Sequence, residues 1–454
     1  MGSAIHAAHA TLELLPVSSR KPSILKGFRD YTPDQMRLRL QVIGIFRTIF
    51  ERHGFEPIDT PALEYMEILT GKAGENEKLM YHFLDQGERE VGLRYDLTVP
   101  LARYVAMHQQ ESVLPFKRYH IAPVWRAEKP QRGRFREFWQ CDADIVGSPS
   151  MLADAEAVSI LTEALAAVNL PNAVVLINHR KLLEAMALLA GVDAERAGGV
   201  FRAIDKLAKI GPDGVKRDLI ATGIDEIAAN RVIELATRTG TPQELLGAAE
   251  RDLEAIPGGV EAVSDLRDLV VALDEFGVSP ASWKIDLSLA RGIDYYTGPV
   301  FEATVEEPKI GSVAGAGRYD HLVGTFLGRD IPATGMSLGM ERILDVIQEF
   351  GLLPRRHATA AVVIPVLPDT LREASRLANE LRGAGINVDL SLLANRSLGD
   401  QLKVAARRGI PWAIIAGPDE ISRDVALIRD LTTGEQREVA RDGIVDEAKR
   451  TVSR

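Results

Sequence analysis

The sequence predicts a mixed α+β protein with a helical insertion and a separate C-terminal α/β domain. Helix and strand patterns mix between about 23 and 180 and return between about 283 and 350. From about 182 to 280 the pattern becomes helical, with apolar residues spaced as in Val200, Ala203, Ile204 and Leu207. After 358, the runs AVVIPV, INVDLS and WAIIAG alternate with two helical runs, which is typical of a βαβ-type domain.

These patterns divide the chain into four parts. Residues 1–22 are expected to form a flexible N-terminal arm, because the segment lacks a basic stretch before an apolar core and contains Glu13, unlike a signal peptide. The first domain spans 23–350 and includes the insertion. A linker at 351–358 leads to the C-terminal domain at 359–454.

Composition restricts the class of protein. The 454 residues exceed one typical core, and 46% hydrophobic with 26% charged residues is ordinary for a globular chain. Nothing approaches about 18 consecutive apolar residues, so no membrane span is expected. One cysteine, Cys141, excludes an internal disulfide and indicates a reducing, cytoplasmic location. The net charge of -10 argues against a generally basic nucleic-acid-binding surface.

The first domain begins with a helix, QMRLRLQVIGIFRTIFERHG, that ends at Gly54. An extended segment follows, FEPIDTPALE, which contains Pro57 and Pro61. LRYDLT, at 93–98, is predicted to be another extended segment and offers Arg, Asp and Thr side chains.

Two strands, FKRYHIAPVWRAE and RFREFWQCDADIVG, are predicted to form a hairpin joined by the short loop KPQRG. On the second strand Gln140, Asp142 and Asp144 share one face by their period of two. Such a polar face indicates a ligand-binding surface, and a structural network of buried salt bridges is the alternative.

Seven basic residues lie between Lys117 and Arg136 against one acid, Glu128. Their interleaving with aromatic residues makes an anion-binding site as reasonable as a solvated charge run.

Further along, RGIDYYTG connects the predicted strands WKIDLSLA and PVFEATVE and is far more polar than a plain turn needs. GMSLGMERI is predicted to be a strand entering a helix with Arg342 in its first turn, a suitable place for a phosphate.

Several common motifs are absent from the sequence. It contains no GxxxxGK[ST] phosphate loop, no GxGxxG after a strand, no GxSxG elbow and no Cys/His set with metal-ligand spacing. The glycine-rich GSVAGAGRYD lacks the lysine of a phosphate loop.

Taken together, these segments resemble the histidyl-tRNA synthetases, a family of class II aminoacyl-tRNA synthetases, over roughly 24–454. FEPIDTPALE resembles the first class II motif, WRAE with RFREFWQCD the second, and GMSLGMER the third. RGIDYYTG resembles the signature peptide of the histidine enzymes. The resemblance implies a catalytic domain built on an antiparallel sheet, a helical insertion and a C-terminal α/β anticodon-binding domain.

The resemblance also implies an ATP-dependent reaction through histidyl-adenylate and pyrophosphate, followed by transfer of histidine to the 3′ end of its tRNA. Arg126 matches the family position that contacts the ATP α-phosphate and the histidine carboxylate. Glu128 matches the position near the adenine, Arg134 lies near the phosphates, and Arg342 matches the γ-phosphate position. Arg291 matches the arginine that assists attack on the α-phosphate, so Arg126 and Arg291 are the expected catalytic residues.

The α-ammonium group of histidine is expected to contact Asp96 and Thr98, with Gln140 nearby. Its imidazole is expected to lie near Asp144, Tyr295 and Tyr296. The matching histidine-binding positions are Asp96, Thr98, Arg126, Gln140, Asp144, Arg291, Tyr295 and Tyr296.

The resemblance further implies a homodimer, Mg²⁺ accompanying ATP, no membrane association, and tRNA as the macromolecular partner. The basic hairpin loop with Lys129 and Arg132 would meet the acceptor end. In the C-terminal domain the anticodon would contact Arg396, Lys403, Arg407 and Arg408, which could equally form a solvated helix face.

Two alternatives belong to other classes. One is a catalytically inactive, histidine-binding regulatory paralogue, which typically lacks the anticodon domain and has a degraded RGIDYYTG segment. The other is a class II enzyme for a different amino acid, which the same segment disfavours.

One departure from the family is Ala316 within GAGRYD, where glycine is usual and where alanine fits if its φ is negative. LRYDLT and QCDAD resemble the eukaryote-like branch, so the acceptor-end nucleotides are not fixed by the resemblance.

Overall fold

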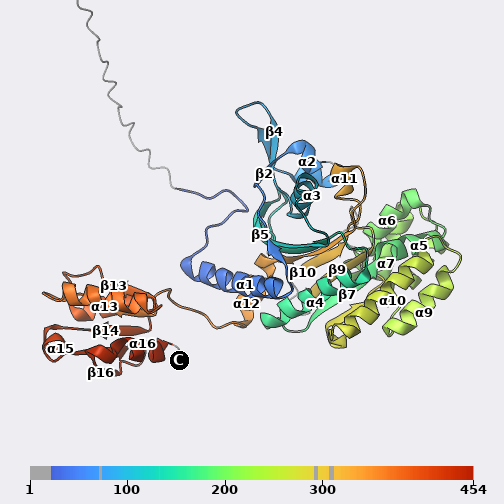
Figure 1. The fold of residues 1–454 in the computed structure, drawn as a ribbon. Coiled ribbons are helices and arrows are strands. Elements are labelled where there is room, and N and C mark those ends of the chain that lie inside the picture. Colours follow the sequence, from blue (N-terminus) through green and yellow to red (C-terminus); the bar gives the residue numbers. More distant parts are fainter. Residues whose placement is uncertain (1–21, 71–73, 132, 291–294, 306–310, 453–454) are drawn as a thin grey trace, which may run out of the picture.

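The computed structural model describes residues 22–70, 74–131, 133–290, 295–305 and 311–452, and Figure 1 shows its fold. An eight-stranded sheet forms the centre of the first domain, in the order β1-β5-β6-β11-β10-β9-β7-β8. All neighbours are antiparallel except β1 with β5 and β7 with β8. The strands are β1 (Glu56–Pro57), β5 (Phe116–Trp125), β6 (Glu137–Val146), β7 (Ala173–His179), β8 (Trp283–Ile285), β9 (Pro299–Val305), β10 (Ser312–Arg318) and β11 (Ala333–Gly339).

One face of this sheet is covered by α1 (Pro33–Arg52), α4 (Met151–Ala167) and α12 (Met340–Phe350) (Figure 1). Phe46, Phe50 and Ile160 fill the core between these helices and the sheet. The side chain of Thr32 caps α1 in a capping box with Gln35, and the helix ends before Gly54 as predicted. Because apolar residues of the strands face these helices, their polar residues point to the other face.

The other face lies under a small sheet and three short helices. β2 (Leu63–Tyr65), β4 (Glu90–Leu93) and β3 (His82–Leu84) form the small sheet in that order. The helices are α2 (Met66–Thr70), α3 (Thr98–Met107) and α11 (Gly324–Leu327). They surround the polar side of the large sheet, where the cavities lie.

A helical layer packs on the edge of the sheet. It consists of α5 (Arg180–Leu189), α6 (Ala194–Ile204), α7 (Leu207–Ala221), α8 (Glu226–Ala236), α9 (Pro242–Leu253) and α10 (Gly259–Glu275). α10 packs against α4, α5 and α9 and so joins this layer to the sheet. Val200, Ala203 and Ile204 are buried on α6 as their spacing predicts, whereas Leu207 begins the next helix.

The C-terminal part has its own five-stranded sheet, ordered β13-β12-β14-β15-β16. β12 (Val362–Ile364) lies parallel to β13 (Val388–Leu390) and β14 (Trp412–Ile415), with α13 (Leu371–Gly383) and α14 (Leu398–Arg407) as the expected connections. β15 (Val425–Asp430) and β16 (Gln436–Ala440) continue the sheet antiparallel, before α16 (Ile444–Val452). Among the described helices, none has the length and apolar character needed to cross a membrane.

Three expectations about local structure were wrong in part. WKIDLSLA is a strand only to Ile285, because the Asp286 carboxylate accepts hydrogen bonds from the backbone N–H and the hydroxyl of Ser288 and starts a turn. The extended part of LRYDLT ends at Leu93, and Thr98 is the first residue of α3.

The β5–β6 hairpin has the predicted strands but a longer connection, from Arg126 to Arg136. Just beyond the strand ends the N–H of Arg126 donates to the carbonyl of Arg136, and the N–H of Arg136 donates to the carbonyl of Gly27 in the N-terminal segment, both at 2.9 Å. Ala316 lies within β10, where backbone φ is negative, so the substitution for glycine is accommodated as expected.

Candidate active site

Two adjoining cavities open on the polar face of the large sheet. The first has a volume of about 130 Å³ and the second about 310 Å³. Arg126, Gln140, Tyr295, Tyr296 and Ser337 line both, so they mark the point where the cavities meet. The geometry allows a small ligand in the first cavity to touch a larger ligand in the second.

Buried carboxyl groups dominate the first cavity and its floor. Asp144 lines it and is 2% exposed, and Asp142 lies two residues before it on β6. One buried guanidinium, that of Arg118, contacts Asp144 at 2.8 Å. Burial raises the pKa of Asp96 and Asp144, and it raises the pKa of Asp142 to about 8. A cationic group bound here would stabilise the charged carboxylates.

Three tyrosines form the wall opposite these carboxyl groups. The rings of Tyr295 and Tyr296 lie 4.7 Å apart, and Tyr319 meets Tyr295 edge-on at 6.1 Å. The Tyr319 hydroxyl donates a hydrogen bond to Asp144. Burial raises the pKa of all three hydroxyls, so they remain protonated hydrogen-bond donors. Gly335 pairs with Asp144 across β11 and β6, and a Cβ there would overlap the carboxylate.

Asp96 has a structural role that the sequence did not reveal. Its carboxylate accepts hydrogen bonds from the backbone N–H groups of Thr98, at 3.2 Å, and Val99, at 3.0 Å. These contacts cap the start of α3 and hold Asp96 at the cavity. Gln140 donates from Nε2 to the Ser337 hydroxyl at 2.6 Å. Within the described part of the chain its Oε1 is buried without a hydrogen-bond partner, so it can accept from a ligand.

Arginines and aromatic rings characterise the second cavity. Arg126 Nε donates to the carbonyl of Tyr95 at 3.1 Å, and its guanidinium lies 4.2 Å from the Tyr95 ring centre and 5.0 Å from that of Phe138. Arg134 forms an ion pair with Glu128 at 2.7 Å. These planar cations suit a polyanionic ligand.

Arg342 lies in the first turn of α12 and also lines the second cavity. It donates to the carbonyls of Ser312, at 2.5 Å, and Gly133, at 3.4 Å, which hold its guanidinium at the cavity edge. Its neighbour Glu341 was not recognised from the sequence. Glu341 is buried and accepts hydrogen bonds from Arg29, from Arg39 at 2.7 Å and from the backbone of Trp139 at 3.2 Å, so it fixes the start of α12.

The structure brings most of the predicted site residues together. The first cavity is lined by Asp96, Thr98, Arg126, Gln140, Asp144, Tyr295 and Tyr296, and the second by Arg126, Glu128, Arg134 and Arg342. Arg291 and Arg132 lie outside the described residues. Lys129 is exposed on the β5–β6 connection, and Arg396, Lys403, Arg407 and Arg408 are exposed on the C-terminal part. Arg408 forms an ion pair with Asp389 at 2.5 Å.

Arg118 and Tyr319 contact Asp144 and were not identified as site residues. The seven basic residues between Lys117 and Arg136 do not form one patch, because Lys117 pairs with Glu156 while Arg118 points into the site. Arg118 lies directly opposite Asp144 in the β5–β6 ladder. A period of two along β5 assigns Arg118 to one face of that strand, so the sequence carries a signal for the side on which Arg118 lies but not for its partner.

An antiparallel sheet with helices on one face and a two-part, arginine- and carboxylate-lined cavity on the other defines a class II aminoacyl-tRNA synthetase catalytic domain. The profile "Histidyl-tRNA synthetase" matches residues 27–343, and "Anticodon binding domain" matches residues 360–451. The chain belongs to the histidyl-tRNA synthetase family, and its function is that of a histidine–tRNA ligase.

Individual relatives agree with this assignment. A histidine–tRNA ligase of Aeropyrum pernix is 44% identical over 92% of this chain and 95% of its own. The crystal structure of the histidyl-tRNA synthetase from Nostoc sp. PCC 7120 superposes with a TM-score of 0.86 at 34% identity, covering 94% of this chain and 99% of that one. A protein described as an ATP phosphoribosyltransferase regulatory subunit/histidyl-tRNA synthetase, from Bacillus halodurans C, has a TM-score of 0.72 at 24% identity, covers 85% and 97%, and shares the fold.

Proposed function

We propose that the first cavity holds histidine, that the second holds ATP, and that Arg126 acts where they meet. The observation that carries this assignment is the contact between a cavity of buried carboxyl groups and a cavity of arginines, with Arg126 lining both. An amino acid offers a cation to the first cavity and its carboxylate toward Arg126. ATP offers its phosphates to the second.

Adenylate formation follows from this placement. A carboxylate oxygen of histidine attacks the α-phosphorus, the bond to the bridging oxygen of the β-phosphate breaks, and pyrophosphate leaves. Arg126 holds both reacting groups, and Arg134 and Arg342 stabilise the charge that develops on the departing phosphates. Arg291 is assigned the same task at the α-phosphate. A fixed cation such as Arg126 contributes about 10²–10³ in rate, whereas the exposed Arg134 contributes less.

Selectivity for histidine is assigned to the first cavity. The α-ammonium group would contact Asp96, Thr98 and the Gln140 Oε1, which has no other partner among the described residues. The imidazole would lie near Asp144, Tyr295 and Tyr296 and exchange hydrogen bonds through its two ring nitrogens. A site that hydrogen-bonds a substrate group rejects analogues without that group by about 10⁴–10⁵.

Mg²⁺ is proposed to enter with ATP, because phosphate oxygens are its preferred ligands. Glu128 lines the second cavity, is paired with Arg134, and keeps its assignment beside the adenine rather than at the ion. Glu341 does not fit as a ligand of the ion, because both of its oxygens accept hydrogen bonds from the protein. When bound, the ion would neutralise phosphate charge that the arginines leave uncompensated.

The second half-reaction requires tRNA. The exposed Lys129, with Arg132 three residues after it in the sequence, is assigned to the acceptor end, which must reach the adenylate. Anticodon contacts are assigned to Arg396, Lys403, Arg407 and Arg408, all on the part that matches an anticodon-binding domain. We place the catalytic domain at 23–350, its insertion at about 182–280, the linker at 351–358 and the anticodon-binding domain at 359–454.

A homodimer is proposed on the apolar surface of the small sheet. Leu63 and Tyr65 on β2 and Phe83 and Leu84 on β3 are exposed. Leu63 lies within the segment FEPIDTPALE that resembles the dimer-forming motif, and the other three residues follow it, so a second copy is the proposed occupant. Sedimentation equilibrium tests this: a monomer at micromolar concentration would contradict it, as would a dimer unchanged by Leu84→Lys.

A cytoplasmic location is proposed because the single cysteine is a buried free thiol.

The proposed site is tested by ATP–pyrophosphate exchange on the full chain, with each of the twenty amino acids offered separately. Exchange with histidine alone is expected. Exchange with a different amino acid would contradict the assignment of the first cavity. No exchange at all, with histidine still bound, would favour the regulatory alternative and would refute the roles given to Arg126 and Arg291.

A further inference from the structure

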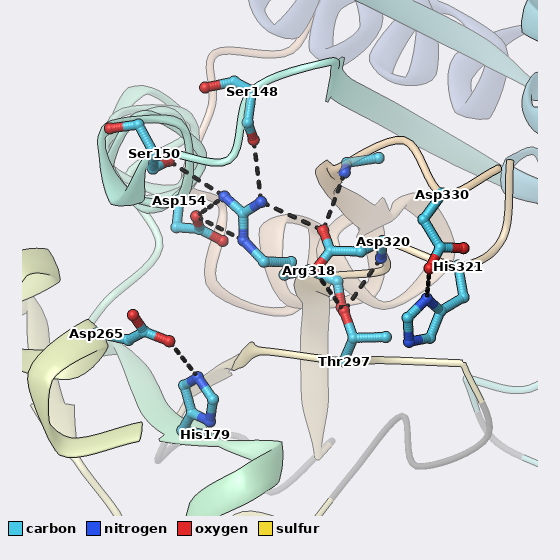
Figure 2. A network of polar contacts seen from close by, with 11 residues as sticks. Ser148, Ser150, Asp154, His179, Asp265, Thr297, Arg318, Asp320, His321 and Asp330 are labelled. Carbon is cyan, nitrogen blue, oxygen red and sulfur yellow. Dashed lines mark hydrogen bonds and ion pairs between the residues drawn. The ribbon is translucent and has the colours of Figure 1, made fainter. Parts of the chain in front are cut away.

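A buried arginine next to the histidine cavity lines neither cavity. Arg318, at the end of β10, is 4% exposed, and Figure 2 shows its guanidinium directed at the start of α4. It donates to the carbonyls of Ser148 and Ser150, at 3.0 and 3.1 Å, and to the buried carboxylate of Asp154. These contacts anchor the end of β10 to the first turn of α4.

The same guanidinium is linked to the segment that carries the two cavity tyrosines. Arg318 Nη1 donates to Asp320 Oδ1 at 3.3 Å, and the hydroxyl of Thr297 donates to Asp320 Oδ2 at 3.0 Å (Figure 2). That hydroxyl also accepts from the N–H of Asp320 at 3.1 Å. Because Thr297 directly follows Tyr296, these hydrogen bonds fix the backbone next to a residue that lines the first cavity.

Two close approaches lock the paired segments together. A Cβ on Gly298 would lie 2.8 Å from Arg318 Cδ, and a Cβ on Gly317 would lie 2.9 Å from the ring of Tyr296. Each glycine thus makes room for a side chain of the opposite segment. The N–H of Thr297 also donates to the carbonyl of Arg318 at 2.8 Å. The ring of Tyr296 therefore has little freedom relative to β10.

We propose that Arg318 and Thr297 are positioning residues for histidine: they set the affinity for the amino acid by fixing Tyr295 and Tyr296, without touching a substrate. The inference rests on the histidine contacts proposed for those tyrosines. It also explains why the RGIDYYTG segment ends in threonine and glycine: the hydroxyl binds Asp320 and the glycine admits Arg318.

The hydroxyl of Thr297 is tested by a matched pair of variants in ATP–pyrophosphate exchange. Thr297→Val removes the hydroxyl and leaves Asp320 without two hydrogen bonds, whereas Thr297→Ser keeps the hydroxyl. Thr297→Val is expected to raise the KM for histidine about tenfold, a factor that corresponds to ~1.4 kcal/mol. The KM for ATP should change less than about twofold, and Thr297→Ser should stay near the parent value.

The guanidinium is tested by Arg318→Lys, with Arg441→Lys as the matched control. Arg441 is also buried and paired to two carboxylates, Glu373 and Glu380, but it lies in the C-terminal part. Both variants should lower the melting temperature. Only Arg318→Lys should raise the KM for histidine. A rise in that KM without a similar rise in the KM for ATP distinguishes a positioning role from general destabilisation.

A third variant separates failure of the inference from failure of the proposed site. Tyr296→Phe is expected to raise the KM for histidine. If it does so while Thr297→Val and Arg318→Lys leave that KM at the control values, the positioning inference is overturned and the proposed site stands. If Tyr296→Phe leaves it unchanged, the histidine contacts are wrong and the inference falls with them.

Discussion

The two cavities meet at Arg126 but are built differently. Around the first, the contacts are buried and already made: Arg118 and Tyr319 hold Asp144, and α3 is capped by Asp96. In the second, the Arg134 side chain is 46% exposed and is paired with Glu128. The comparison indicates that selection of the amino acid depends on preorganised buried groups, whereas binding of the nucleotide depends on adaptable surface charge.

The largest effect is expected where the two cavities join. Arg126→Ala should lower the rate constant of ATP–pyrophosphate exchange by about 10²–10³, because it removes a fixed cation at the reacting phosphate. Single-turnover kinetics with saturating histidine and ATP measure this. A loss confined to the KM values, with an unchanged rate constant, would show that Arg126 only binds substrates.

The next effect separates buried from exposed ion pairs. Asp144→Asn should lower the free energy of unfolding by about 3–5 kcal/mol, because it leaves Arg118 buried without a carboxylate. The control Asp389→Asn, which breaks the exposed pair with Arg408, should cost less than about 1 kcal/mol. Denaturant unfolding checks both. Equal losses of unfolding free energy in Asp144→Asn and Asp389→Asn would contradict the distinction between preorganised buried charge and adaptable surface charge.

A smaller effect is expected from pH in the absence of ligands. The pKa of Asp142 rises from 3.8 to about 8 on burial, so the folded chain binds more protons than the unfolded chain between these values. The contribution of Asp142 to the free energy of unfolding should therefore fall as pH rises from about 4 to about 8, while His120, whose pKa burial lowers to about 4, contributes the opposite trend. Melting temperatures across this range measure the slope, which Asp142→Asn should reduce. The exposed control Asp446→Asn should leave it unchanged, and a slope that survives Asp142→Asn would contradict the assignment.

The smallest effect is expected in the second cavity. Arg134→Ala should raise the KM for ATP only several-fold and leave the KM for histidine and the melting temperature unchanged, because its ion pair is solvent-exposed. Initial-rate exchange assays test this. A rise in the KM for histidine as large as that for ATP would show that the cavities are not independent.

The sequence was most informative where one periodic pattern coincided with chemistry. The alternation of Gln140, Asp142 and Asp144 predicted the polar strand face beside the first cavity. The strand-to-helix pattern predicted the position of Arg342 in the first turn of α12. Contacts between distant segments could not be predicted, because they depend on strand order. Arg118 meets Asp144 only through the β5–β6 register, and Tyr319 reaches it from the end of β10, a strand in another part of the sheet.

Local hydrogen bonding explains the errors. Asp96 looked like part of a strand, but its carboxylate caps α3, and Asp286 ends β8 by accepting from Ser288. Short polar side chains compete with strand hydrogen bonding in this way. A period-of-two pattern therefore predicts which face a residue occupies more dependably than where its strand ends.

Asp142, whose pKa burial raises to about 8, should ionise when the ammonium group of histidine binds in the adjoining first cavity. Titration calorimetry at pH 7.5, in buffers with different ionisation enthalpies, measures this directly as protons released per histidine bound. Net proton release is expected, and Asp142→Asn should diminish it. No release, net proton uptake, or release that Asp142→Asn leaves unchanged would contradict it.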